Sequence, residues 1–301
     1  MKIFICYDMK DTPHGGANQF LKALKKQFKK NDSYADNVPE ADVVLYNSHH
    51  DIKTLIQIKD IFPNKIYVHR IDGPMKLYNN MNDERDHIVY HFNKLANATV
   101  FQSQWSYEQN LRMGLRCKKP SIVIYNAPDP NIFNTDYEKK ENDKLRLIAT
   151  SWSDNPKKGF KYYDFLDKNL NFDKYEVYFA GRSPINFKNI KMLGPLTSEN
   201  LSEQIKLSDV FITASENDPC SNSLIEALSC GKPAIALRSG GHPELVKQGG
   251  YLFDDNQDLI NRIEDITKNI ELCKKNIQVD NIEVVAGKYA DFFEGMLQWR
   301  N

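Results

Sequence analysis

Two carboxylates and a group of serines between them are the residues of this sequence that best suit the binding of a polar ligand. Asp218 and Glu226 lie eight residues apart in the segment FITASENDPCSNSLIEALSCGKP, which starts at Phe211. On a helix, eight residues correspond to about two turns and a rotation of roughly 80°, so both carboxylates can face one side. Carboxylates accept hydrogen bonds from sugar hydroxyls. The pair therefore suits a ligand that carries several hydroxyls.

A helix is predicted to position these carboxylates. Asp218 followed by Pro219 is typical of an N-cap and a first helical position, and Gly231 is typical of the residue after a helix end. We therefore expect a helix from Asp218 to about Cys230.

The start of this helix is the predicted anion site. Free backbone amides at a helix N-terminus attract phosphate, and the side chains of Ser221, Asn222 and Ser223 add polar groups there. Short apolar, β-rich runs flank the helix at Val210–Ala214 and Pro233–Leu237, as expected of buried parallel strands. Sugar hydroxyls and a diphosphate would meet at this strand, turn and helix.

The whole segment resembles the donor-binding signature of retaining glycosyltransferases with the GT-B fold, particularly glycosyltransferase family 4 (glycosyl transferases group 1). In that signature two Glu residues stand eight apart and are followed by Ala, Gly and Pro. Here the register falls on Asp218, Glu226, Ala227, Gly231 and Pro233. The first family Glu is therefore an Asp; Glu216 is an alternative, but it breaks the register. The resemblance implies that Asp218 contacts the donor sugar and Glu226 the ribose.

A lysine-containing loop adds positive charge. The sequence ATSWSDNPKKGF, from Ala149, resembles the family's diphosphate-binding loop, and Lys158 before Gly159 fits its lysine. Trp152 stands where the family has an arginine, and Lys157 or Arg182 is a candidate to replace that charge. A cation beside the diphosphate stabilises the charge that develops on the leaving group, which would allow the reaction without a metal ion.

The first half of the chain supplies weaker matches. Gly15 and Gly16, after the first strand, resemble glycines that let backbone amides approach the donor phosphates. His69 is interpreted as the last residue of the third strand, in IYVHRIDG, where ligands reach the carboxyl ends of parallel strands. The resemblance implies that His69 contacts the reacting sugar, with Arg70 and Asp72 as neighbours of interest.

Alternating strands and helices predict an α/β protein of two domains. Strands are expected at Ile3–Tyr7, Val43–Tyr46, Ile66–His69, Thr99–Phe101 and Ile122–Tyr125, and then at Leu145–Ala149, Glu176–Ala180, Lys191–Leu193, Val210–Ala214, Ala234–Leu237 and Tyr251–Phe253. The stretch 127–144, rich in Pro, Asp and Asn, is expected to link the two halves.

The resemblance implies the GT-B architecture, two doubly wound Rossmann-like domains that face a central cleft. We expect an N-terminal, acceptor-side domain over 1–127 and a C-terminal domain over 128–283 that binds the nucleotide sugar. The helix predicted over 284–301 would pack back on the N-terminal domain.

Composition narrows the function classes. Lys plus Arg and Asp plus Glu number 40 each, so net charge does not steer the chain toward nucleic acid. Five cysteines without regular spacing predict reduced thiols and no metal site.

No segment is long and apolar enough for a membrane span, and we expect a cytoplasmic protein. The lysine-rich face predicted for Gly16–Lys30 is interpreted as a solvated surface or a peripheral membrane or acidic-acceptor surface.

The resemblance thus implies a retaining, metal-independent glycosyltransferase that uses a nucleoside diphosphate sugar, has no cofactor and acts on a glycan, lipid or protein-linked hydroxyl. The expected catalytic residues are His69, Asp218 and Lys158, and the expected donor-binding residues are Gly15, Gly16, Arg182, Ser221, Asn222, Ser223 and Glu226. Alternatives are a silent GT-B module that binds a glycan or nucleotide, and a sugar-nucleotide epimerase of the same fold. A phosphorylase would require pyridoxal phosphate, and a transferase acting on DNA bases would require strongly salt-dependent binding.

Overall fold

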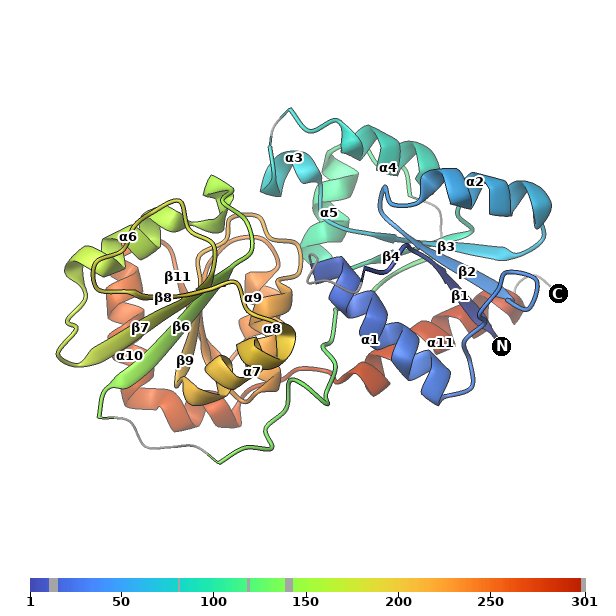
Figure 1. Cartoon of the computed structure of the whole chain (residues 1–301). Coiled ribbons are helices and arrows are strands. Elements are labelled where there is room, and N and C mark those ends of the chain that lie inside the picture. The colour runs from blue at the N-terminus through green and yellow to red at the C-terminus, as the bar shows by residue number, and fades with distance from the viewer. Residues whose placement is uncertain (11–15, 81, 118–119, 139–142, 299–301) are drawn as a thin grey trace. The chain divides into compact units, whose positions relative to one another are not determined.

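The computed structural model describes residues 1–10, 16–80, 82–117, 120–138 and 143–298. The chain divides into two compact units, which are drawn in Figure 1. The first unit comprises Met1–Ala127 together with Asp280–Asn301, and the second comprises Pro128–Val279.

A parallel sheet forms the centre of the first unit, in the strand order β1-β2-β3-β4-β5. Its strands are β1 (Ile3–Cys6), β2 (Val43–Asn47), β3 (Ile66–Ile71), β4 (Ala98–Phe101) and β5 (Ser121–Val123). Every residue of β2, β3 and β4 is buried. Burial of both faces explains why these strands are almost continuous apolar runs.

Helices cover both faces of this sheet. They are α1 (Gly16–Lys30), α2 (Ile52–Ile61), α3 (Met75–Tyr78), α4 (Arg85–Asn93), α5 (Gln104–Arg112) and α11 (Ile282–Gln298). α1 and α11 lie side by side on one face, where Phe20 and Tyr289 pack in the same core with ring centroids 6.3 Å apart (Figure 1). α2 and α4 cover the opposite face. The last helix of the chain thus belongs to the first unit.

The second unit contains a six-stranded parallel sheet in the order β11-β10-β9-β6-β7-β8. The strands are β6 (Leu145–Ser151), β7 (Tyr175–Gly181), β8 (Lys191–Gly194), β9 (Val210–Thr213), β10 (Ala234–Leu237) and β11 (Gly250–Phe253). All six coincide with strands expected from the sequence, with ends that differ by at most two residues. The predicted α/β class with parallel sheets is therefore confirmed.

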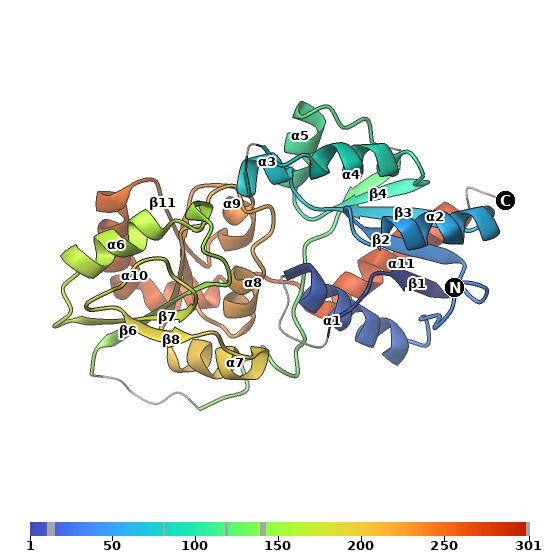
Figure 2. The same ribbon diagram turned by 45° about the horizontal axis from the view of Figure 1, so that its top comes forward.

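Helices also pack on both faces of the second sheet. They are α6 (Phe160–Asn169), α7 (Ser198–Leu207), α8 (Asn222–Ser229), α9 (His242–Val246) and α10 (Asn256–Lys275). α6 and α10 share one hydrophobic core with the strands, while α7 and α8 contact each other on the other face (Figure 2). No helix in the described part of the chain combines the length and the apolar character that crossing a membrane requires.

Candidate functional site

The carboxyl ends of three adjacent strands of the second unit carry most of the predicted site residues. Strands β10, β9 and β6 are neighbours in the sheet, so the loops that follow them share one edge. Ligands of open parallel α/β sheets bind outside this edge. We call the loops over 152–159, 214–221 and 238–241 the second-unit edge.

Two glycines bring these loops into backbone contact. Gly159 has φ +78°, and a Cβ built on it would lie 2.1 Å from the carbonyl oxygen of Ala214. Gly240 has φ +61°, and its Cβ would lie 2.2 Å from the carbonyl oxygen of Asp218, which also accepts a hydrogen bond of 2.8 Å from the Gly241 N–H. Only glycine combines this conformation with such close approach. Backbone contacts at these two glycines therefore set the distances between the three loops.

Lys158 and Asp218 meet across two of these loops. The Lys158 Nζ lies 3.4 Å from the Asp218 Oδ2, and the two side chains are 31% and 16% exposed. Lys158 ends the short 3₁₀ turn Pro156–Lys158, which the side chain of Asn155 caps. The structure thus brings together the residue predicted to bind phosphate and the residue predicted to bind sugar hydroxyls, and both remain reachable by a ligand.

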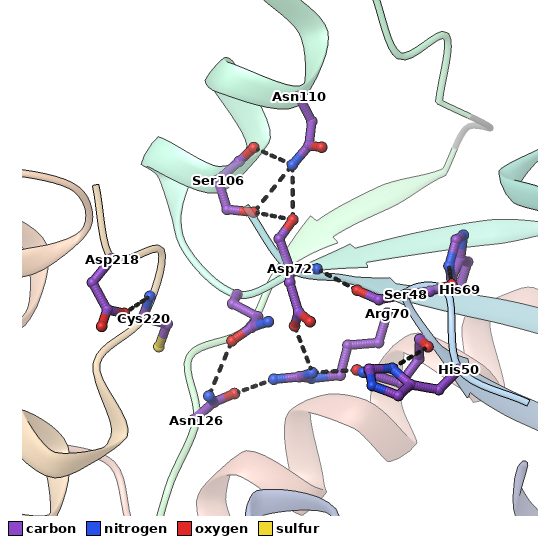
Figure 3. Close-up of polar contacts among 12 residues, drawn as sticks. Ser48, His50, His69, Arg70, Asp72, Ser106, Asn110, Asn126, Asp218 and Cys220 are labelled. Carbon is purple, nitrogen blue, oxygen red and sulfur yellow. Dashed lines mark hydrogen bonds and ion pairs between the residues drawn. The ribbon is translucent and has the colours of Figure 1, made fainter. Parts of the chain in front are cut away.

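The helix that follows starts later than predicted. α8 begins at Asn222, with Ser221 at the N-cap, and not at Asp218. The Asp218 Oδ1 instead accepts a hydrogen bond of 3.2 Å from the Cys220 N–H (Figure 3), and Asn217 has φ 56°. This local turn satisfies the Asp218 side chain and competes with the predicted helix cap. The prediction of Asp218 as the N-cap is therefore wrong.

The predicted diphosphate residues lie at the true start of α8. Ser221 is the N-cap, and Asn222 and Ser223 are the first two residues of the helix. The Ser221 hydroxyl does not cap the helix and lies 3.4 Å from the Ser223 Oγ. The anion-binding character of a helix N-terminus therefore falls on these three residues.

Glu226 is located in the middle of α8, where it is partly buried. Burial raises the pKa of its carboxyl to about 7. Among the described residues, its side chain makes no hydrogen bond or ion pair. A carboxylate in this state gains from a ligand that donates hydrogen bonds to it.

The alternative acid Glu216 has other partners. Its carboxylate binds Lys161 at 2.9 Å and Lys157 at 3.4 Å. Lys157, a candidate for the missing cation, is therefore engaged with Glu216. Arg182 follows β7 directly and has an exposed side chain, while its N–H donates to the Ser151 carbonyl oxygen at 2.8 Å. Arg182 stays the candidate for that charge.

His242 was not identified from the sequence. It is fully buried at the first position of α9, where its Nδ1–H donates to the Leu237 carbonyl oxygen at 2.9 Å and its Nε2 has no partner among the described residues. Burial lowers its pKa; Asp218 opposes this shift and Lys158 adds to it. The N–H of Gly241, the residue before His242, donates to the Asp218 carbonyl oxygen at 2.8 Å, so His242 is held next to the loop that carries Asp218. Its only signal in the sequence was its position after two glycines in SGGHPE.

The structure contradicts the predicted position of His69. Strand β3 continues to Ile71, so His69 lies inside the strand and not at its end. The side chain is fully buried, with Nε2 2.9 Å from the Ser48 carbonyl oxygen and Nδ1 3.3 Å from the Asn93 amide, and it stacks on Tyr46. Burial lowers its pKa to about 3. This packing leaves His69 no surface for a sugar.

Arg70 forms the centre of a buried polar network in the first unit (Figure 3). Its fully buried guanidinium donates to the side chains of Asn47 and Asn126, the latter at 2.6 Å, and lies 3.3 Å from the Asp72 Oδ1. Asp72 follows β3 directly, and its side chain is 14% exposed. Asp72, rather than His69, is therefore the acidic or basic side chain that β3 presents at its carboxyl end.

Backbone contacts fix Asp72 in this position. The Asp72 N–H donates to the Ser48 Oγ at 3.1 Å, and its carbonyl oxygen accepts from the Ser106 Oγ at 3.1 Å and the Asn110 Nδ2 at 2.9 Å (Figure 3).

Of the two glycines predicted to approach the donor phosphates, Gly16 is the first residue of α1. Gly15 lies outside the described residues.

Comparison with solved structures identifies the fold as GT-B. The chain matches sucrose-phosphate synthase from Thermosynechococcus elongatus with a TM-score of 0.77 and 13% identity, over 99% of this chain and 100% of that one. It also matches Anabaena Alr3699/HepE, crystallised in complex with UDP, with a TM-score of 0.73 and 17% identity over 98% and 100% of the two chains.

The second unit also matches a family by sequence. The family model of glycosyl transferases group 1 matches residues 185–279, which include Asp218, Glu226 and His242. N-acetyl-alpha-D-glucosaminyl L-malate synthase from Bacillus anthracis is 38% identical over 58 residues, 19% of this chain and 15% of that protein. The curated relatives are matched over about half of their length or less.

Proposed function

We propose that this protein is a retaining glycosyltransferase that moves a sugar from a nucleoside diphosphate to a hydroxyl acceptor without a metal ion. The observation that carries the proposal is the Lys158–Asp218 ion pair at the carboxyl edge of the second sheet. Asp218 lies in the loop that leads into α8, within the segment that matches glycosyl transferases group 1, and Lys158 lies in the loop after β6. A cation, a carboxylate and a helix N-terminus at one edge suit a ligand with both phosphates and hydroxyls.

Lys158 is assigned to the diphosphate. When the donor binds, the phosphates replace Asp218 as the partner of the Lys158 ammonium, and the start of α8 supplies further N–H donors. Positive charge at this position is worth most in the transition state, because the bond to the leaving diphosphate breaks and negative charge grows there. The same replacement frees one oxygen of Asp218 to accept a hydroxyl of the donor sugar.

Glu226 is assigned to the ribose. Its carboxyl has no protein partner among the described residues, and burial raises its pKa to about 7. Two neighbouring ribose hydroxyls can donate to the two carboxylate oxygens, which favours the charged form and offsets the cost of burial.

The proposed reaction takes place on one face of the donor sugar. The bond between the anomeric carbon and the diphosphate oxygen breaks, and the acceptor oxygen forms a bond to the same carbon from the same side. The acceptor proton passes to the oxygen of the leaving diphosphate, so the configuration is retained. In this scheme Asp218 orients the sugar; its other oxygen already accepts the Cys220 N–H.

UDP-glucose is the first donor to test. Anabaena HepE, which shares the fold at 17% identity, was crystallised with UDP and with UDP-glucose. Release of nucleoside diphosphate should be measured for UDP-, GDP-, ADP- and dTDP-sugars in buffer that contains a chelator. We expect slow release from one donor in the absence of an acceptor.

A matched pair of lysine variants links this turnover to the site. Lys158→Ala should lower the rate of release by about a hundredfold, whereas Lys268→Ala, on the exposed surface of α10, should leave it unchanged. Binding of a nucleotide without release would indicate a silent module. Conversion of the donor to an isomer, with the diphosphate still attached, would indicate an epimerase.

A further inference from the structure

A group of aromatic and polar side chains gathers at the carboxyl edge of the first sheet, in the unit that does not contain the residues assigned above. Tyr7 follows β1, His49 and His50 follow β2, and Asp72 follows β3. Because these strands are neighbours in the order β1-β2-β3, the loops lie next to one another. We call these four residues the first-unit cluster.

The three ring side chains of the first-unit cluster are in contact. The rings of His49 and His50 are tilted by 34° with centroids 4.2 Å apart, and the centroid of the Tyr7 ring lies 5.1 Å from that of His50. Burial raises the pKa of the Tyr7 hydroxyl, and the negative charge of Asp72 adds to this shift. All four side chains are partly exposed. The cluster therefore presents ring faces and polar atoms on one surface.

The loop that carries the two histidines has an unusual backbone. Ser48 has φ 45° and Asp51 has φ 52°, so two residues other than glycine adopt the left-handed conformation within four positions. The Asp51 Oδ2 ties this loop to the loop after β1 by accepting the Asp8 N–H at 2.7 Å. Such backbone strain persists only where surrounding contacts enforce it, and it concentrates at functional sites.

Charges around the cluster disfavour an anionic ligand. Asp72 pairs with Arg70, and two further carboxylates nearby, Asp8 and Asp83, pair with Lys10 and Arg85. These pairs hold three carboxylates and three cations, and Asp51 adds a fourth carboxylate, whose contact is a backbone N–H. A phosphate or carboxylate brought here would meet more negative than positive charge.

Hydrogen-bond acceptors are available in the cluster. The buried His49 Nδ1 has no partner among the described residues, and burial lowers the pKa of this ring to about 4, so it is neutral at pH 7. Only one oxygen of Asp72 contacts Arg70. A neutral imidazole nitrogen and a carboxylate oxygen both accept hydrogen bonds from hydroxyls. The flanking rings provide apolar faces on which a sugar ring can pack.

We propose that the first-unit cluster binds an uncharged carbohydrate as the acceptor, with sugar hydroxyls donating to His49 and Asp72 and a sugar ring packed on His50 and Tyr7. The inference rests on the proposed transferase function and specifies its acceptor class. It predicts selection against phosphorylated acceptors, because carboxylates outnumber cations around the cluster among the described residues.

The test uses methyl glycosides of glucose, galactose, mannose and N-acetylglucosamine, together with the matching sugar 6-phosphates. Release of nucleoside diphosphate is followed against acceptor concentration, and binding of the same compounds is measured by saturation-transfer NMR. We expect at least one neutral glycoside to saturate. Its 6-phosphate should show a KM or Kd at least tenfold higher.

Variants connect this binding to the cluster. His50→Ala and Tyr7→Leu should each raise the KM or Kd for the glycoside at least fivefold, and His87→Ala, an exposed histidine on α4, should not. His50→Gln replaces His50→Ala if thermal melting shows that the alanine variant unfolds. Unchanged values in both cluster variants would overturn the inference.

The inference and the proposed function fail separately. Absence of donor hydrolysis in water contradicts the transferase function, whereas the NMR titration still reports on the cluster. Tighter binding of the 6-phosphates, or saturable binding of none of the glycosides, overturns the inference even if a donor is hydrolysed.

Discussion

The Lys158 Nζ lies 3.4 Å from the Asp218 Oδ2, although the two residues are 60 positions apart in the sequence. Neighbouring strands, β6 and β9, deliver them to the same edge, and the glycine after Lys158 lets the two loops touch. In the absence of ligand, each residue neutralises the other. A donor with phosphates and hydroxyls can bind both side chains at once, with a phosphate on Lys158 and a hydroxyl on Asp218.

Lys158→Ala should lower kcat for donor hydrolysis by about a hundredfold, the typical effect of removing one donor that stabilises a developing anion. Lys158→Arg should recover part of this loss because it retains the charge. Steady-state release of nucleoside diphosphate is the measurement. Activity of Lys158→Ala within threefold of wild type would contradict the assignment.

Asp218→Ala should separate sugar recognition from phosphate recognition. Because the variant frees the Lys158 ammonium, affinity for the nucleoside diphosphate should stay equal or rise a few-fold, while kcat/KM for the nucleotide sugar falls at least tenfold. Calorimetric titration with UDP, next to donor kinetics, compares the two. An equal loss of UDP affinity and of kcat/KM for the nucleotide sugar would indicate that Asp218 only shapes the loop.

Nucleoside binding should depend on the ionisation of Glu226. Burial raises the pKa of its carboxyl to about 7, and ribose hydroxyls favour the carboxylate. The affinity for the nucleoside should therefore rise between pH 6 and pH 8, by up to about tenfold for each pH unit below the pKa. Glu226→Gln should remove this dependence. Titration with uridine avoids the ionisation of the phosphates, and an equal pH slope in both proteins would contradict the ribose assignment.

Glu226 should also make the folded protein less stable at higher pH. Its carboxyl titrates at about 7 in the folded state against 4.5 for the free side chain, so the folded state binds more protons between these values and stability falls as pH rises through them. Glu226→Gln should therefore raise Tm by about 5 °C at pH 8 and have little effect at pH 4.5. Calorimetry at both pH values tests the sign.

Gly159→Ala should destabilise the second unit by about 3 kcal/mol or more, because the added Cβ would overlap the Ala214 carbonyl and adopt φ +78°. Gly287→Ala is the matched control. A Cβ at Gly287, inside α11, meets no atom within 4 Å among the described residues, so this change should stabilise the protein by about 0.5–1 kcal/mol. Urea denaturation compares the two variants.

Local pattern determined much of the secondary structure. The strand Ala234–Leu237 and the helix Gly16–Lys30 have the predicted limits, because an apolar run between turn residues and a helical spacing of apolar residues are properties of contiguous sequence. The eight-residue spacing of Asp218 and Glu226 is also a property of contiguous sequence. The GT-B fold inferred from that segment is confirmed by the structural comparisons.

Tertiary contacts decided the rest, since they join residues that are remote in the sequence. His69 is buried by Ser48, Asn93 and Tyr46. The later start of α8 has a local cause, because the Asp218 side chain accepts the N–H of Cys220, two residues ahead. No periodicity predicts such partners or the pKa values that burial produces. Sequence determined which elements form and which side chains are polar; packing determined which of those side chains reach a ligand.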